Sequence, residues 1–181
     1  MKIIRAIFAI CAFSFLMGCT TLPEPKSEND NLVIGIIMHT GEGYADYSGA
    51  TVNGIHKNGI ELVVKNTNTN EEYKILTKKN GLFYTIELPE GIYRIEQFYL
   101  RVTVGNAWAD TYSIPNNNLT FTVTGGEIIN LGVINWNAKM RGGTNYTYAR
   151  LYDDVEDELK AQYPKSEWLT RPFNWVQIQQ S

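Results

Sequence analysis

The chain has 181 residues, of which 19% are charged and 44% are apolar, and its formal net charge at pH 7 is −3. This length suits one folded domain, and the apolar content is too high for a chain that is disordered throughout. The charge balance is mildly acidic and the sequence holds no basic patch. Nucleic acid is therefore not an expected partner.

The N-terminus has the layout of an export signal. Lys2 and Arg5 precede an uncharged apolar run, AIFAICAFSFLM, which is shorter than the ~20 residues needed to span a bilayer. The run ends in Leu16-Met17-Gly18-Cys19. This ending resembles the lipobox of bacterial lipoproteins, in which a diacylglycerol is attached to the cysteine and cleavage takes place just before it.

The resemblance implies a signal peptide over residues 1–18 and a lipidated Cys19 that carries diacylglycerol and palmitate-type acyl chains. Buried acyl chains contribute ~0.8 kcal/mol per methylene, so two or three chains would anchor the protein firmly. Cys11 would leave with the signal and Cys19 would be blocked, which excludes disulfides and cysteine catalysis. In the enterobacterial sorting rule, a residue other than Asp directly after the lipidated cysteine is typical of the outer-membrane class. Thr20 has this position here, so the chain resembles that class. We expect a cell-envelope location at the outer membrane, on either its periplasmic or its surface face.

Residues 19–31 combine two prolines with charged and small polar side chains. Such a composition is typical of an extended linker. We therefore expect residues 19–31 to form a flexible tether that lifts the folded domain off the membrane.

From Leu32 onward the sequence has the pattern of short strands and turns. The run LVIGIIM is apolar without interruption, which predicts a strand buried on both faces. Asn80-Gly81 predicts a turn because both residues tolerate positive φ angles. Strands are expected at 32–38, 60–64, 72–77, 82–88, 92–104, 109–114, 119–124 and 128–136, with the second and third paired as a hairpin. Many short strands with frequent turns indicate an antiparallel sandwich or barrel.

The expected strand at 92–104 changes phase along its length. Tyr93 and Ile95 place the apolar set at odd numbers, whereas Phe98 and Leu100 place it at even numbers. One extra residue near Gln97, in a bulge or a bend, would restore a single buried face.

One helix is expected near the C-terminus. It begins at the acidic residues 153–156, which suit the positive end of a helix dipole, and Pro164 ends it. Leu151, Val155 and Leu159 have the spacing of one helical face. The aromatic tail beyond the helix holds Trp168, Phe173 and Trp175. We expect residues 150–181, helix and tail, to pack on a β-sandwich domain of residues 32–149.

Two turn motifs carry a family resemblance. They are Thr77-x-x-x-Gly81-x-Phe83 and Leu88-Pro89-x-Gly91-x-Tyr93, in which two turns require glycine and two aromatic rings fill one core. They resemble the prealbumin-like modules, which include the carboxypeptidase regulatory-like and adhesin B-type repeats. This resemblance, over about residues 32–104, implies a mainly β, antiparallel prealbumin-like β-sandwich, here with an added C-terminal α-helix. It implies little about function.

We find no convincing catalytic constellation. His39 and His56 flank the same loop-like stretch, but no further ligands with metal spacing accompany them, so neither a metal nor a cofactor is expected. A hydrolase, the least favoured function, would need one of these histidines to face a nucleophile in a pocket. Lys65, Glu96 and Asn135 have the residue types of the isopeptide bond found in some adhesin B-type modules, although surface polar residues are the preferred interpretation.

Aromatic side chains offer a further possibility, because a strip of exposed rings can stack on sugars. The candidates are Trp108, Tyr112, Tyr146 and Tyr148, which we expect in loop-rich stretches, with core and edge packing as the favoured alternative. The sequence as a whole predicts a lipid-anchored envelope protein that is not an enzyme and acts as a binding or scaffolding module. Its expected partners are the membrane and an envelope protein or glycan, and the alternative function is that of a carbohydrate-binding module.

Overall fold

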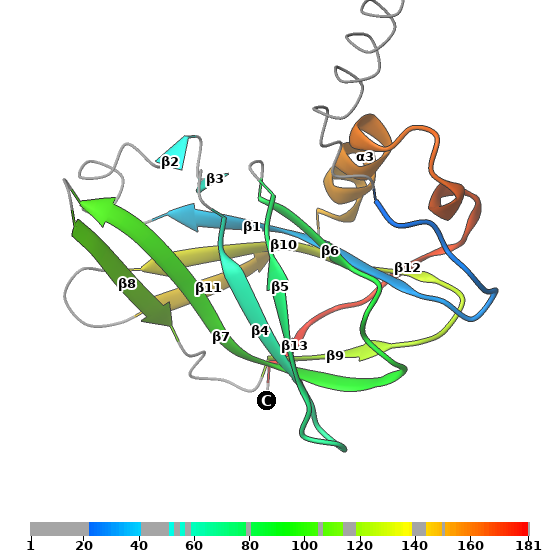
Figure 1. The fold of residues 1–181 in the computed structure, drawn as a ribbon, viewed down its shortest axis with the longest axis horizontal. Helices are drawn as coiled ribbons and strands as arrows, with labels where there is room; N and C mark the ends of the chain where they lie inside the picture. The colour runs from blue at the N-terminus through cyan, green and yellow to red at the C-terminus, as the bar shows by residue number, and fades with distance from the viewer. Residues whose placement is uncertain are drawn as a thin grey trace, which may run out of the picture.

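Figure 1 shows the computed structural model, which describes residues 22–40, 51–52, 55–56, 59–78, 81–104, 107–113, 119–138, 144–149 and 151–180. The expected signal peptide and Cys19 lie outside these residues. The described chain is mainly β, with two larger sheets and one α-helix, α3 (Tyr152–Gln162). No helix in this described part is long and apolar enough to cross a bilayer.

The first sheet has five strands. They are β1 (Leu32–Thr40), β6 (Leu82–Thr85), β10 (Ile128–Ala138), β11 (Thr144–Ala149) and β12 (Phe173–Trp175). Their order is β11-β10-β1-β6, and β12 pairs with the first residues of β10. The expectations included no strand at β11 or β12. In β11, TNYTYA, Tyr146 and Tyr148 alternate with polar residues, which is a strand signal that the expectation of a loop-rich stretch missed.

The second sheet has six strands. They are β4 (Glu61–Asn66), β5 (Glu72–Leu76), β7 (Gly91–Val104), β8 (Ala107–Ser113), β9 (Leu119–Val123) and β13 (Gln179–Gln180). Their order is β13-β9-β7-β4-β5, with β8 paired to the second half of β7. The hairpin of β4 and β5 confirms the predicted pairing. A separate pair is formed by β2 (Thr51–Val52) and β3 (Ile55–His56).

The two sheets share one hydrophobic core. Phe83, Tyr93 and Phe98 lie in it without solvent exposure, and the ring of Tyr93 stacks on Phe121 at 5.7 Å. Burying a side chain of this size contributes ~1.5–3 kcal/mol. The other core residues are Val33, Ile37, Ile60, Leu62, Val64, Ile75, Leu88, Ile95, Leu119, Val123, Ile129, Leu131, Ile134 and Ile178. Contact between these side chains holds the sheets together.

A second core lies on the other face of the five-stranded sheet, under α3 and the short 3-10 helix η1 (Glu167–Thr170). Leu32, Ile34 and Ile36 point into this second core, whereas Val33 and Ile37 point into the first. Strand β1 is therefore buried on both faces, which confirms the prediction from its uninterrupted apolar run. The five-stranded sheet is the middle layer of the molecule, between the helical layer and the six-stranded sheet (Figure 1).

The predicted phase change in β7 is a β-bulge. Val63 of β4 pairs with Gln97, but its neighbour Val64 pairs with Ile95, so Glu96 is the extra residue. Tyr93 and Ile95 before the bulge and Phe98 after it all point into the first core. The prediction of one inserted residue near Gln97 is confirmed.

The expectation of a purely antiparallel arrangement is wrong. Strand β1 pairs in parallel with β10, and β12 also pairs in parallel with β10. Hydrophobic patterning shows which residues are buried but not which distant strand is the neighbour. The pairing of β1 with β10 follows the usual rule for parallel strands, because α3 covers the face of the sheet that the first core leaves open.

Helix α3 follows the prediction in extent but not in every contact. Val155 and Leu159 are fully buried, as the spacing predicted, whereas Leu151 is 48% exposed. Leu151 is the residue that precedes the first helical turn, so it does not continue the buried face. Its side chain cannot accept a capping hydrogen bond, and Asp153 and Asp154 instead lie in the first turn, where the helix dipole favours negative charge.

The described part of the expected tether is packed on the protein. Leu22 is only 3% exposed and belongs to the second core, and Asn31 is 6% exposed. The expectation of a flexible tether is therefore wrong from Leu22 onward. The partners of this segment lie near Trp168, some 145 positions away, so no local pattern could have indicated them.

Candidate functional site: the aromatic surface beside helix α3

The structure places the four aromatic residues predicted from the sequence on strands rather than loops. Trp108 and Tyr112 are on β8, opposite Thr103 and Tyr99 of β7. Tyr146 and Tyr148 are on β11, in the other sheet, opposite Trp136 and Ile134 of β10. The four backbone positions are thus divided between the two sheets. Their side chains lie outside the part of the chain that the structure describes.

An aromatic residue that the sequence analysis assigned to packing is instead exposed. Trp175 of β12 has 57% of its surface accessible to solvent. Its ring lies parallel to that of Tyr152, the first residue of α3, with a centroid distance of 5.6 Å and an interplanar angle of 1°. Its indole Nε1 donates a hydrogen bond of 2.5 Å to Oε1 of Glu156. Trp175 is therefore an exposed ring held in one orientation.

Glu156 is the buried polar centre of this surface. Its residue is only 9% exposed, and its second oxygen, Oε2, lies 3.4 Å from the ammonium of Lys160, one helical turn on. The Lys160 ammonium also lies over the ring of Phe173, 5.5 Å from its centroid. These contacts fix β12 against α3. A charge this far from water is acceptable because both carboxylate oxygens have donors.

We call the set formed by Leu151, Tyr152, Glu156, Lys160, Phe173 and Trp175 the α3 aromatic surface. Its amphipathic indole is held in place by Tyr152 and Glu156, and Leu151, the residue before Tyr152, is another large apolar side chain left half exposed. A fixed indole of this kind can stack on a ligand ring or lie in the interfacial region of a bilayer. No local sequence pattern indicates this surface, because the exposure of Trp175 depends on how β12 pairs with the distant strand β10.

A second feature joins the N-terminal segment to the C-terminal tail. The indole Nε1 of Trp168 donates a hydrogen bond of 2.6 Å to the carbonyl oxygen of Pro23. The carboxylate of Glu24 accepts hydrogen bonds from Ser166 Oγ at 2.9 Å and from the backbone N–H of Glu167 at 2.8 Å. The guanidinium of Arg171 lies over the Trp168 ring and donates to three backbone carbonyls, those of Ser27, Glu28 and Asp30.

Residues 22–30, which we call the N-terminal strap, also hold their own shape. The carboxylate of Asp30 accepts hydrogen bonds from the backbone N–H of Lys26 and from both the hydroxyl and the N–H of Ser27. The hydrogen bond from the Ser27 side chain is the main cause that lowers the pKa of Asp30, and the N–H of Lys26 adds to it. The strap therefore has a defined turn at residues 26–30 and is bound to the body through Pro23 and Glu24, so it is not an extended linker.

A tyrosine pair packs against the second core, to which Leu22 of the strap also belongs. Tyr84 of β6 and Tyr163 meet edge to face at 5.7 Å, their hydroxyls are 3.4 Å apart, and the ammonium of Lys78 lies 4.8 Å from the centroid of Tyr84. Burial raises the pKa of Tyr163 to about 12, and the hydrogen bond with Tyr84 acts in the same direction. Tyr163 therefore remains neutral at physiological pH.

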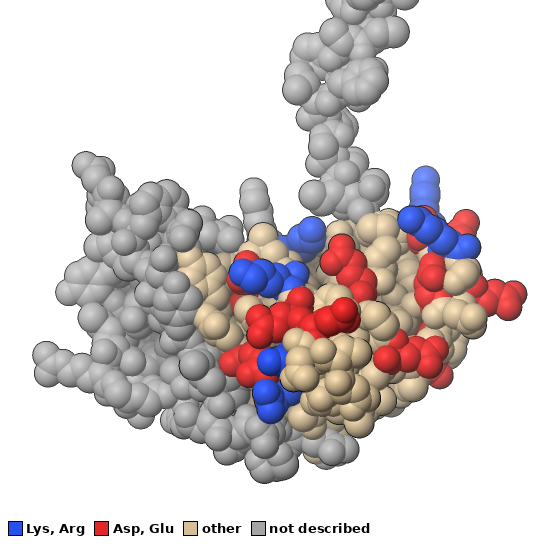
Figure 2. Space-filling model, turned by 60° about the horizontal axis from the view of Figure 1, so that its bottom comes forward, with Lys and Arg blue, Asp and Glu red and all other residues tan. Residues whose placement is uncertain are grey.

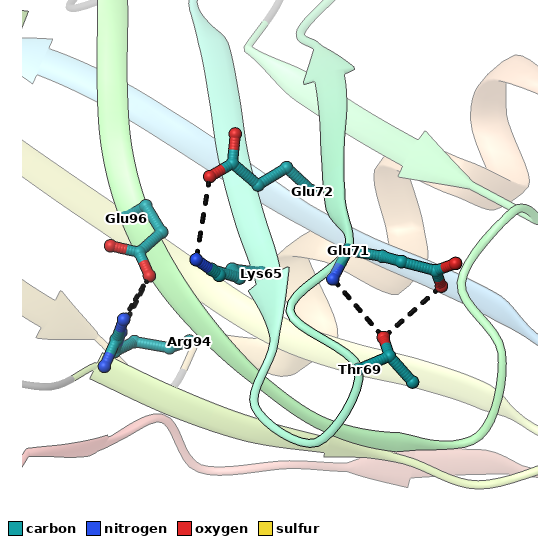
Figure 3. A network of polar contacts seen from close by, with 6 residues as sticks. All are labelled: Lys65, Thr69, Glu71, Glu72, Arg94 and Glu96. Carbon is teal, nitrogen blue, oxygen red and sulfur yellow. Dashed lines mark hydrogen bonds and ion pairs between the residues drawn. The ribbon is translucent and has the colours of Figure 1, made fainter.

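The polar residues considered for an isopeptide bond are engaged elsewhere. The Lys65 ammonium pairs with Glu72 at 3.9 Å, and Glu96 pairs with Arg94 on the same strand (Figure 3). Glu96 is partly exposed, whereas promotion of an isopeptide needs a buried carboxylate. Asn135 is on β10, in the opposite sheet. The structure therefore does not support that bond.

Acidic and basic side chains are interspersed over the described part of the face that Figure 2 shows. The ion pairs Lys65–Glu72 and Lys74–Glu61 are solvent-exposed and contribute little to stability.

The two histidines are on neighbouring elements. His39 is on β1 and His56 on β3, and the backbones of β1 and β3 approach each other. Both side chains lie outside the described part of the chain. Within the described residues, no group of three or more His, Cys, Asp or Glu side chains could hold a metal ion.

Comparison with known proteins adds little. No family model matches the chain, and no curated protein matches it. A crystal structure of a leucine-rich repeat protein from Bacteroides thetaiotaomicron VPI-5482 is similar over 61% of this chain and 14% of that chain, at 14% identity and a TM-score of 0.39. A similarity of this size supports no statement about fold or function.

Proposed function

We propose that the protein is a lipid-anchored cell-envelope protein, attached through Cys19, that works by binding or scaffolding a partner without catalysis. The observation that carries the proposal is the sequence LMGC directly after an export-type apolar run.

The outer membrane is the proposed location because Thr20 follows the cysteine. The anchor is tested by intact-mass spectrometry of the protein extracted from bacterial membranes, with Cys19→Ser as the matched variant. We expect the added mass of the acyl chains on a chain that begins at Cys19, and an unprocessed, unacylated product for Cys19→Ser. An unmodified N-terminus and recovery only in aqueous fractions would contradict the proposal.

Within the mainly β fold, we propose a prealbumin-like sandwich. Two observations on the motif residues support this assignment. Gly81 and Gly91 have positive φ angles of 84° and 156°, as turns that require glycine would. Phe83 and Tyr93 follow these glycines by two residues and are both fully buried in the first core. An experimental structure whose strand order differs from that of the prealbumin-like modules would contradict the assignment.

The partner of the binding module can be sought by affinity capture from envelope extracts. The strap belongs to the fold, so the soluble chain should begin at Thr20 in order to include it. Recovery of the same envelope component by the wild-type chain and not by a heat-denatured sample would support a binding role. Conversion of an envelope substrate by the purified chain would contradict it.

A carbohydrate-binding module is the second candidate function. The observation that favours it is that Trp108 and Tyr112 lie on β8 and Tyr146 and Tyr148 on β11, and within the described residues each strand pairs on one side only. Edge strands are accessible to ligands. Binding to cell-wall glycans that is lost in Trp108→Ala and retained in Trp175→Ala would support this function. Absence of binding to any cell-wall glycan would end it.

A further inference from the structure

The N-terminal strap is fastened along its length and leaves little slack. Leu22 is buried in the second core, the carbonyl of Pro23 is held by Trp168, and the carboxylate of Glu24 is held by residues 166 and 167. Arg171 then binds the carbonyls of residues 27, 28 and 30. The chain is thus fixed to the body from its first described residue.

The remaining link to the proposed anchor is short. Three peptide units separate Cys19 from Leu22, which corresponds to at most about 11 Å when fully extended. A free tether over residues 19–31 would instead reach about 40 Å. A body fixed at Leu22 cannot move far from the membrane or turn its opposite side toward it.

The side of the body that holds Leu22 is the helical layer. The strap begins next to α3 and runs along η1, on the face of the five-stranded sheet that points away from the six-stranded sheet (Figure 1). We propose that the layer formed by α3, η1 and the strap faces the membrane and contacts its headgroup region. This inference rests on the proposed lipid anchor at Cys19. The six-stranded sheet and its β4–β5 turn then face away from the bilayer.

The composition of this layer fits a lipid interface. Trp175, 57% exposed, stacks on Tyr152 of α3, and Leu151, 48% exposed, precedes the same helix. Exposed indoles favour the interfacial region of bilayers, where the ring is in an apolar and the N–H in a polar environment. These two residues give the layer apolar contacts of its own, in addition to the acyl chains.

The charge of the layer determines which lipids it tolerates. Asp153, Asp154 and Asp157 are exposed on α3 and would be repelled by anionic headgroups. We therefore expect closer contact with zwitterionic vesicles than with vesicles rich in anionic lipid, and the difference should shrink as salt screens the charges.

The test uses the acylated protein in phosphatidylcholine vesicles that carry an energy acceptor on the headgroup. Both native cysteines are accounted for, because Cys11 leaves with the signal and Cys19 is acylated, so an introduced cysteine is the only thiol available for a donor dye. Lys165→Cys places the dye between α3 and η1, and Asn68→Cys places it in the β4–β5 turn as the matched control. Both positions are exposed.

We expect higher energy transfer from position 165 than from position 68. Insertion of 20 Gly/Ser residues between Thr21 and Leu22 gives a spacer of roughly 25 Å and should make the two efficiencies equal. Equal transfer without the spacer, or higher transfer from position 68, would overturn the orientation while the anchor stands. If the protein isolated from bacterial membranes carries no acyl groups, the anchor is overturned, and the orientation with it.

Tryptophan fluorescence tests the contact itself. Lipids brominated near the headgroup should quench the wild-type protein, and Trp175→Phe should lose part of this quenching, because Trp168 is buried. If Trp175→Phe leaves the quenching unchanged while Trp175→Ala abolishes binding of a soluble sugar, the α3 aromatic surface is a sugar site and the membrane contact is disproved.

Discussion

The indole Nε1 of Trp168 donates a hydrogen bond of 2.6 Å to the carbonyl oxygen of Pro23, although 145 positions separate the two residues. The Trp168 ring is fully buried, and the guanidinium of Arg171 lies over it at 4.7 Å. The N-terminal strap and residues 166–171 thus form one structural unit on the outer face of the five-stranded sheet. An N-terminal segment that looks like a linker in composition is part of the fold.

Trp168→Phe should destabilise the protein. The substitution leaves the Pro23 carbonyl without its donor and reduces the volume of a fully buried ring, and we expect a loss of about 2–4 kcal/mol in the free energy of unfolding. Urea denaturation measures it. Trp175→Phe is the matched comparison: its ring is 57% exposed, so the substitution should cost less, about 1–2 kcal/mol, most of it from the donor that the Glu156 carboxylate loses. Equal effects of the two substitutions would show that the buried indole does not hold the strap.

Arg171→Lys should release the strap without unfolding the body. A lysine ammonium cannot reproduce the fork with which Arg171 reaches the carbonyls of Ser27, Glu28 and Asp30. We expect faster hydrogen exchange in residues 22–30 and faster proteolysis there, with a loss of about 1–3 kcal/mol in local stability. Lys165→Ala, at an exposed position of the same layer, should leave both rates unchanged.

The sequence predicted those features that depend on neighbouring residues. The apolar run of β1 indicated burial on both faces, and the odd-to-even change in β7 located its bulge to within one residue of Glu96. The parallel pairing of β1 with β10 was missed because strand patterns identify faces and not partners. The docking of residues 22–30 was missed for the same reason, because its partners come from residues 166–171.

The candidate site was harder to predict than the fold. Trp175 and Trp168 both look like packing residues in an aromatic tail, yet one is 57% exposed and the other fully buried. Residue type is the same in both cases, and only the register of β12 against β10 and the position of η1 distinguish them. A ligand surface that depends on such tertiary placement cannot be inferred from composition or spacing.

Asn130→Ala should weaken the connection between β10 and α3. Asn130 is fully buried, its Oδ1 accepts from the N–H of Gly132 at 2.9 Å, and its Nδ2 donates to the carbonyl of Tyr152 at 3.0 Å. Loss of the side chain leaves a buried donor and a partly buried acceptor unpaired, which should cost about 2–3 kcal/mol. The free energy of unfolding tests this. Asn174→Ala, which removes a half-exposed hydrogen bond to Glu127, should cost less than about 1 kcal/mol.

Gly81→Ala should destabilise the contact of β6 with β1. Gly81 has a φ angle of 84°, its carbonyl accepts from the N–H of Ile37 at 2.9 Å, and an added Cβ would lie 2.6 Å from the Ile37 carbonyl oxygen. Backbone strain and this clash should together cost about 2–4 kcal/mol, measured by thermal or urea unfolding. Gly125→Ala is the milder comparison, because Gly125 has no positive φ angle and its added Cβ would first meet the end of the Glu90 side chain, with the Asn29 carbonyl oxygen at 3.1 Å. A neutral Gly81→Ala would contradict the proposed requirement for glycine in this turn.

Tyr163→Phe should change the response of the protein to alkaline pH. The pKa of Tyr163 in the folded protein, about 12, is higher than the ordinary value of about 10, because burial and the hydrogen bond with Tyr84 favour the neutral phenol. The stabilisation is therefore complete below pH 10 and is lost as the pH rises through 12. In Tyr163→Phe, the free energy of unfolding should fall less steeply over this interval. In an ultraviolet titration of the folded variant, one tyrosine fewer than in the wild type should ionise near pH 12. If the missing tyrosine is instead one that ionises near pH 10, the Tyr163 hydroxyl is in water.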